Sequence, residues 1–244
     1  MKTSQLFSAI ILCMIFTFSV KAQQKEKTIL KVSYTTSNVS DFLIGSLKAQ
    51  IKDPAQYSKV LNKISAYKIY HTLYQNLKTK ESVYILDSVS AVKGMSTVGH
   101  ASYTFKDSKK ELFGKENFMG KEFRFKGESE NLKWKISNET KEINGYNSRK
   151  AILESNPDIY VWFTTDIPVN AGPYIYYGLP GLVLESNSFF QSITASSISY
   201  SQENIFKEQL ASIEQEIKKS NDVTLKEVIV KKENFKRMAE KGKS

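Results

Sequence analysis

The chain has 244 residues, of which 41% are apolar, 12% aromatic and 25% charged, with one cysteine and a formal net charge of +10. This composition excludes a disordered, collagen-like or disulfide-stapled chain. We expect a single domain, because all-β domains of roughly 200–250 residues are common.

Residues 1–22 have the pattern of a secretory signal peptide. Lys2 supplies the positive start, an apolar run extends from Leu6 to Val20, and Ala22 ends a small-residue cleavage pattern. The run is shorter than the roughly 20 apolar residues of a transmembrane helix, and an uncleaved membrane anchor is the alternative. The sequence predicts export to the periplasm or the cell surface. Cleavage would remove Cys13, the only cysteine, and with it any thiol chemistry.

Residues 221–244 are expected to form a basic C-terminal segment. Within them, positions 226–244 hold seven Lys or Arg and three Glu. A solvated tail explains this composition, and contact with an anionic membrane surface is the functional alternative. Nucleic acid is not expected as a partner, because no binding motif accompanies the charge. We expect a monomer.

Between these segments, residues 23–220 are predicted to form one β-rich domain. Residues 29–34 favour a strand, and Asp53-Pro54 begins a helix with apolar positions to Ile64. Residues 67–77 and 82–89 are typical of paired strands, and the first of them has aromatic residues on both faces. Residues 93–110 are expected to form a loop.

The second half of the chain favours consecutive strands without intervening helices, which indicates an antiparallel meander. A helical stripe then covers 202–219, and 223–230 is strand-like before a helical tail. We therefore predict a mainly β (α+β) fold with a curved antiparallel meander sheet and a covering helix. The element order is also compatible with the half-barrel of periplasmic lipoprotein carriers. The strand candidates are 111–113, 122–126, 131–137, 148–154, 159–164, 181–186 and 189–198.

Recognisable catalytic and cofactor motifs are absent from the sequence. The two histidines, His71 and His100, have no partner at metal-ligand spacing, and His71 is expected to be a satisfied histidine of the core or surface. We predict no metal and no cofactor, and we favour a non-catalytic protein. A carboxylate-dependent hydrolase using Glu154, Asp166 or Glu185 remains the enzymatic alternative.

The most unusual segment is 162–185, which holds three of the five prolines and three glycines. Pro180-Gly181 is expected to form the centre of a type II turn, with Gly181 at positive φ. The motif Gly178-Leu179-Pro180-Gly181-Leu182-Val183 resembles the GLPGLI family of secreted Bacteroidota proteins. The resemblance extends upstream to about residue 130, and the family has no settled activity to transfer.

Two functions are predicted for an envelope protein of this kind. The first is a binding or carrier module for an apolar or amphipathic ligand. The second is docking on an outer-membrane transporter or another partner through residues 170–181, which requires the three tyrosines of that stretch to be exposed together. Structurally, Leu179 and its neighbours could simply pack in the core. The candidate binding residues are Asp166, Tyr174, Tyr176, Tyr177, Leu179 and Pro180.

Overall fold

A computed structural model describes residues 26–90, 92, 99–129, 132–219 and 223–241. Within these residues, twelve strands form one sheet, and four helices accompany it. The helices are α2 (Asp41–Gln50), α3 (Pro54–Ser65), α4 (Glu203–Ile217) and α5 (Leu225–Lys241). The strands are β1 (Ile29–Ser37), β2 (Lys68–Asn76), β3 (Ser82–Val89), β4 (Gly99–Lys106), β5 (Glu111–Phe118), β6 (Lys121–Glu128), β7 (Trp134–Ile143), β8 (Tyr146–Leu153), β9 (Tyr160–Thr164), β10 (Leu182–Asn187), β11 (Ser192–Ser201) and β12 (Val223–Thr224).

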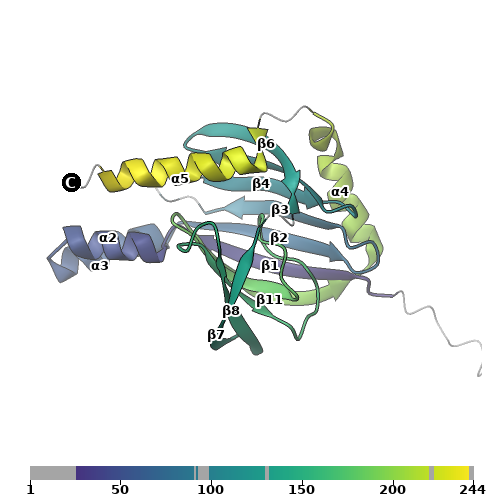
Figure 1. The fold of residues 1–244 in the computed structure, drawn as a ribbon, viewed down its shortest axis with the longest axis horizontal. Helices are drawn as coiled ribbons and strands as arrows, with labels where there is room; N and C mark the ends of the chain where they lie inside the picture. The colour runs from purple at the N-terminus through teal and green to yellow at the C-terminus, as the bar shows by residue number, and fades with distance from the viewer. Residues whose placement is uncertain (1–25, 91, 93–98, 130–131, 220–222, 242–244) are drawn as a thin grey trace, which may run out of the picture.

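The sheet is open and has the order β12-β6-β5-β4-β3-β2-β1-β11-β10-β9-β8-β7. All neighbours are antiparallel except β12 and β6. The sheet curls, so that β7 and β8 cross in front of β1 and β11 (Figure 1). The predicted fold class, a mainly β curved meander with helices, is therefore confirmed.

Local sequence signals explain several of these elements. Asp53 caps α3 by accepting a hydrogen bond from the Ala55 amide at 2.9 Å, and Pro54 opens the helix as expected. Asn144 and Gly145 both have positive φ, as a tight two-residue hairpin between β7 and β8 requires. The N-cap therefore fixes the start of α3, and the hairpin turn fixes the end of β7 and the start of β8.

Two expectations about secondary structure were wrong, and one helix was not predicted. The stretch 93–110 was expected to be a loop, but β4 occupies most of its described part, 99–110, while residues 93–98 lie outside the described ranges. Helix α2 was missed. The predicted strand at 223–230 has only two strand residues, because α5 begins at Leu225 and presents Leu225 and Val228 to the core. An amphipathic period of 3.6 thus prevails over the β-branched composition of that segment.

The two faces of the sheet are covered differently. On the outer face, Phe206 and Ile213 of α4 pack against a small apolar cluster from β1 to β4 that includes Ile29 and Val83. On the inner face, Leu30 and the other alternate positions of the same strands join a larger core with residues 167–184 and α5. The predicted helix at 202–219 therefore covers a face of the sheet, but the other face is covered by an irregular segment and by the C-terminal helix.

Helices α2 and α3 extend away from the sheet, at the left of Figure 1, and neither contains a fully buried residue. None of the helices formed by the described residues has both the length and the apolar character of a membrane span. The predicted signal peptide, with Cys13, lies outside the described residues and stays a prediction.

Candidate ligand-binding site

Residues 165–181, here called the crossing segment, leave β9 and run over the inner face of the sheet before β10. Polar side chains from several strands bind its backbone. Thr104 of β4 donates a hydrogen bond to the Tyr174 carbonyl at 2.9 Å, and the Trp134 indole of β7 donates to the Tyr177 carbonyl at 2.8 Å. These bonds satisfy backbone groups that no regular ladder pairs, and they hold an irregular segment in the core.

The glycines of the crossing segment act differently from the sequence expectation. Gly178, and not Gly181, has positive φ, at +93°, so the predicted type II turn centred on Pro180-Gly181 is wrong. Gly181 is instead a place of close approach, because a Cβ there would clash with the Thr164 carbonyl oxygen. Only glycine lets β10 begin this close to the end of β9.

The three tyrosines of the crossing segment are buried. Tyr174, Tyr176 and Tyr177 are 9%, 6% and 1% exposed. Burial raises the pKa of Tyr176 and of Tyr177 to about 12, and it raises that of Tyr174 well above its usual value. The expectation that they form an exposed docking patch is therefore wrong. Their rings pack inward because the strands beneath them supply matching polar partners, such as Ser82 at 3.0 Å from the Tyr177 hydroxyl.

Tyr174 belongs to a buried polar cluster that joins three elements. Its hydroxyl donates to Glu116 Oε2 of β5 at 2.7 Å. Lys232 Nζ of α5 lies 2.7 Å from the same carboxylate oxygen and 2.9 Å from the Tyr174 hydroxyl. The Glu116 side chain is only 3% exposed, so Lys232 is the cation that offsets its charge. The cluster ties α5 to the crossing segment and to the sheet.

Tyr174 also has an unusual backbone. Its φ is +56°, a conformation that costs roughly 1–3 kcal/mol for a residue that is not glycine. The other non-glycine residues at positive φ are in turns between strands, as at Asn144. Strain of this kind in a buried aromatic residue is typical of functional sites, where the surrounding contacts over-determine it.

A cavity of about 90 Å³ lies beside this cluster, between the inner face of the sheet, the crossing segment and α5. Its walls are mainly apolar, and Tyr174 and Tyr176 contribute to them. Two histidines that the sequence separates by 29 positions, His71 and His100, meet here. Besides these residues, the lining includes Thr36, Tyr84, Ala101, Glu116, Phe118, Phe189, Phe190, Ile193, Val228 and Lys232.

Four buried polar atoms in this lining have no hydrogen-bond partner among the described residues. They are Thr36 Oγ1, His71 Nδ1, Tyr84 Oη and His100 Nδ1. Buried polar groups are almost always paired with protein or water. Burial lowers the pKa of His71 to about 4 and also lowers that of His100. Both histidines of the lining are therefore neutral at physiological pH.

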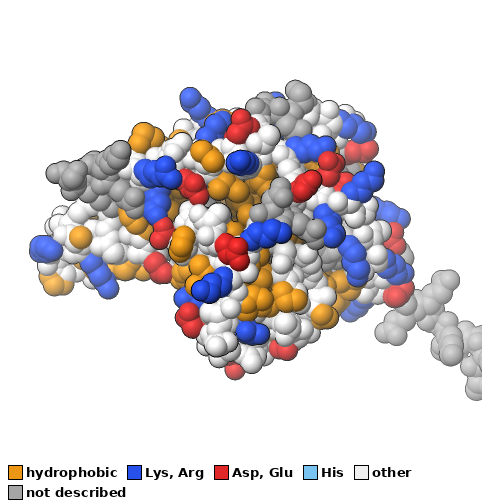
Figure 2. Space-filling view, in the orientation of Figure 1, with side chains coloured by type: hydrophobic (Ala, Val, Ile, Leu, Met, Phe, Trp, Pro, Cys, Tyr) orange, Lys and Arg blue, Asp and Glu red, His pale blue; other side chains and the backbone are white. Residues whose placement is uncertain are grey.

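Aromatic side chains surround the cavity on the side of α5. Phe118, Phe189, Phe190 and Phe235 have ring centroids 4.6–5.8 Å apart in successive pairs. Hydrophobic side chains gather below α5 in the centre of this face of the molecule, with lysines and acidic residues around them (Figure 2). An apolar surround with a few polar groups inside is the usual composition of a small-molecule site.

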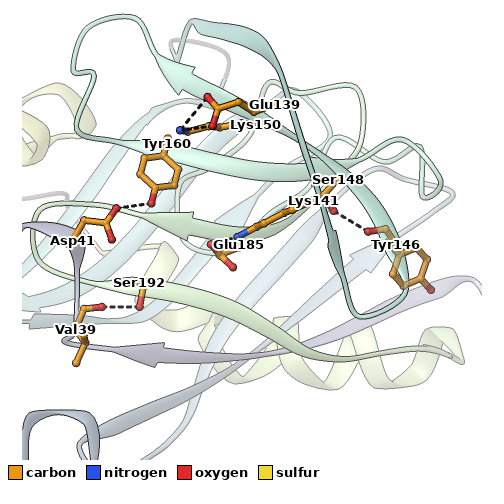
Figure 3. A network of polar contacts seen from close by, with 10 residues as sticks. All are labelled: Val39, Asp41, Glu139, Lys141, Tyr146, Ser148, Lys150, Tyr160, Glu185 and Ser192. Carbon is orange, nitrogen blue, oxygen red and sulfur yellow. Dashed lines mark hydrogen bonds and ion pairs between the residues drawn. The ribbon is translucent and has the colours of Figure 1, made fainter. Parts of the chain in front are cut away.

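The other candidate residues do not join this cavity. Leu179 is buried in the core, and Asp166 and Pro180 are exposed. Glu185 lies on the outside of β10, where Lys141 of β7 binds it at 2.7 Å (Figure 3). Glu154 is exposed in the turn between β8 and β9. The structure thus brings Tyr174 and Tyr176 to the site, but it does not bring the proposed carboxylates together there.

Sequence reasoning missed most of the lining. Thr36, Tyr84, Glu116 and Lys232 are on four different elements, and only strand pairing and the docking of α5 bring them near one another. One signal was available at His71, which lies on a strand with aromatic residues on both faces. The structure places that histidine in the core, as expected, with one hydrogen bond, to the Ala101 carbonyl, and it leaves Nδ1 without a partner among the described residues.

A comparison with protein-family models finds a match to one segment of this site. The model of a family described as "Protein of unknown function (Porph_ging)" matches residues 154–185, which contain the crossing segment. This label is consistent with the Bacteroidota resemblance, whereas membership of the GLPGLI family stays a prediction. None of the curated proteins matches the sequence.

Several solved structures have weak similarity. A crystal structure of PNGF-II in space group C2 has a TM-score of 0.46 and 17% identity, over 80% of this chain and 30% of that one. A second crystal form of PNGF-II, in space group P21, has a TM-score of 0.43 and 19% identity, over 72% and 29% of the two chains. An uncharacterised conserved protein from Thermus thermophilus has a TM-score of 0.35 and 4% identity, over 87% and 98%. The chain spans about 30% of the length of PNGF-II, and no activity is transferred from these proteins.

Proposed function

We propose that the protein is an exported, non-catalytic binding module of the cell envelope for an amphipathic ligand. The ligand's polar end would occupy the cavity between Tyr174 and His71, and its apolar part would leave past the phenylalanines beside α5. The observation that carries this proposal is a cavity with apolar walls whose lining includes four side chains with an unpartnered, buried polar atom. A ligand that pairs with these atoms would remove a desolvation cost of about 1–3 kcal/mol for each of them.

The inner face supports a small site and not a wide carrier barrel. The crossing segment fills most of the space between β7–β9 and β1–β5, and the remaining cavity is about 90 Å³. Drug-sized ligands use pockets of roughly 300–1,000 Å³. The ligand is therefore held by its polar end and first few carbons. Docking through residues 170–181 has no such support, since its tyrosines are buried.

The test is native mass spectrometry on protein purified from its own envelope, before and after solvent extraction. We expect a defined mass increment that extraction removes. The variant Ala101→Val adds two methyl groups to the cavity wall and is expected to abolish the increment. Ala195→Val is its matched control, because Ala195 is equally buried but does not line the cavity. A clean apo mass from the native envelope, or an increment retained in Ala101→Val, would count against the proposal.

A further inference from the structure

We propose that the cavity selects an uncharged polar end, a hydroxyl or a carboxamide, and discriminates against carboxylates and ammonium groups. This inference rests on the proposed function and specifies its ligand class. It follows from the hydrogen-bonding capacity of the cavity walls and from the pairing of the charged groups near them.

The first requirement is that the ligand donates a hydrogen bond. His71 Nε2 lies 2.9 Å from the Ala101 carbonyl oxygen, which can only accept. Nε2 therefore carries the ring proton, and Nδ1 is a bare acceptor in a residue that is 2% exposed. A carboxylate has no proton to offer this nitrogen, whereas a hydroxyl or a primary amide has one.

The second requirement is that the ligand also accepts. The hydroxyls of Tyr84 and Thr36 are each in residues 1% exposed and are close enough to influence each other, and neither has another hydrogen-bond partner among the described residues. Burial raises the pKa of Tyr84, and the neighbouring Thr36 hydroxyl only partly opposes that shift. Tyr84 therefore stays a protonated donor, and its ring stacks on His71 at 4.5 Å. An ammonium group cannot accept from these hydroxyls.

Both lysines that line the cavity are already paired with carboxylates. Lys232 binds the buried Glu116, and Lys236 binds Asp158. Glu233 accepts a hydrogen bond from the Asn156 amide at 3.2 Å. A carboxylate head would lose its hydration without gaining a free lysine, which is costly in a buried site. A neutral head avoids this cost.

The cavity volume determines the size of the probe molecules. About 90 Å³ is smaller than the engineered cavity of roughly 150 Å³ that takes benzene, so four-carbon molecules are suitable. The full chain would be titrated at pH 7.4 with 1-butanol, butyramide, butyrate and butylamine, and backbone amide shifts would be followed by NMR. We expect saturable shifts at Ala101 and Tyr84 with the alcohol and the amide, and at least about tenfold weaker binding of the two ions.

Two threonine variants provide the matched pair. Thr36 and Thr28 are both buried with unpartnered hydroxyls, but only Thr36 lines the cavity. Thr36→Val is expected to weaken 1-butanol binding about fivefold, the usual effect of losing one hydrogen bond, and Thr28→Val to leave it unchanged.

Three other outcomes would contradict the selectivity or the proposed binding function. Binding of butyrate or butylamine as strong as that of butanol would overturn the selectivity while leaving the binding function intact. Equal effects of the two threonine variants would do the same. Absence of saturable binding by all four probes would mean that the cavity holds water only, and it would overturn both proposals.

Discussion

The two faces of the sheet are covered in physically different ways. On the outer face, α4 buries Phe206 and Ile213 against an apolar cluster, and its exposed side is lined by lysine–glutamate pairs. On the inner face, the cover is an irregular segment with a strained Tyr174, held by directional hydrogen bonds to Thr104, Trp134 and Glu116. The four cavity-lining residues that have an unpartnered polar atom are on the inner face.

This difference indicates where stability and binding reside. An amphipathic helix packs on a sheet through apolar contact area alone. The stability that it contributes is therefore additive over its residues and tolerates conservative substitution. A segment held by buried polar contacts tolerates little, because each lost partner leaves an unsatisfied group. Natural proteins accept such costs at functional sites. Substitutions on each face can therefore show whether stability and ligand binding depend on different faces of the sheet.

The largest expected effect is on the outer face. Phe206→Ala removes a ring that is 2% exposed from the α4 contact. We expect the free energy of unfolding to fall by about 3 kcal/mol, the lower end for a buried phenylalanine. Urea denaturation would measure this loss. The dissociation constant of 1-butanol, determined by NMR on the folded variant, should stay within about twofold of the wild-type value, because α4 does not line the cavity.

The control on the same helix is Lys207→Ala. Its side chain is 72% exposed and pairs with Glu203 one turn earlier, so the change in unfolding free energy should not exceed about 0.5 kcal/mol. A Phe206→Ala variant that loses 1-butanol binding while remaining folded would contradict the separation of the two faces.

The second effect is a pH dependence that originates on the inner face. Burial lowers the pKa of His71 to about 4 in the folded protein, against 6.5 in the unfolded chain. The unfolded state therefore binds more protons between these values, and stability decreases as the pH falls through this window. Between pH 7.5 and pH 5 we expect His71 to account for a loss of about 2 kcal/mol, measured by urea denaturation at each pH.

His71→Phe keeps an aromatic ring against Tyr84 and removes the titration. Between pH 7.5 and pH 5, the free energy of unfolding of this variant should fall by about 2 kcal/mol less than that of the wild type. The remaining slope would include His100, whose pKa is lowered by burial in the same direction. Parallel pH profiles for the variant and the wild type would refute the assignment to His71.

Strand and turn chemistry was readable from the sequence because it is local. Alternation identified β2 and β3, and the residues Asp53-Pro54 and Asn144-Gly145 marked a helix start and a hairpin. β4 was missed because the Gly- and Ser-containing residues beside it suggested a loop. Gly99, its first residue, is there because a Cβ would clash with the Asn117 carbonyl oxygen on β5. A glycine required by a neighbouring strand cannot be distinguished from a turn glycine by sequence alone.

The site was less predictable because tertiary pairing assembles it. Tyr174 and Tyr176 were singled out by their unusual segment, but the expectation that they are exposed was wrong. Tyrosine suits both a rim and a buried polar network, and the choice depends on partners such as Glu116 and Ser82. Glu116 precedes Tyr174 by 58 residues, and Ser82 precedes Tyr177 by 95. No local pattern encodes contacts of that separation.

The smallest expected effect tests the polar connection between the inner face and α5. Lys232→Met leaves the Glu116 carboxylate buried with Tyr174 as its remaining partner. We expect a loss of about 1–2 kcal/mol in the free energy of unfolding, less than for a fully buried pair because the Lys232 side chain is 26% exposed. Adding Glu116→Gln should restore at least half of this loss, since the stranded charge is then removed.

Lys236→Met is the matched control on the same helix, where the Asp158 partner is 54% exposed, and it should cost less than about 1 kcal/mol. If the two lysine variants cost the same and Glu116→Gln rescues neither, α5 is held by apolar packing alone. The helices on both faces of the sheet would then be held by apolar packing.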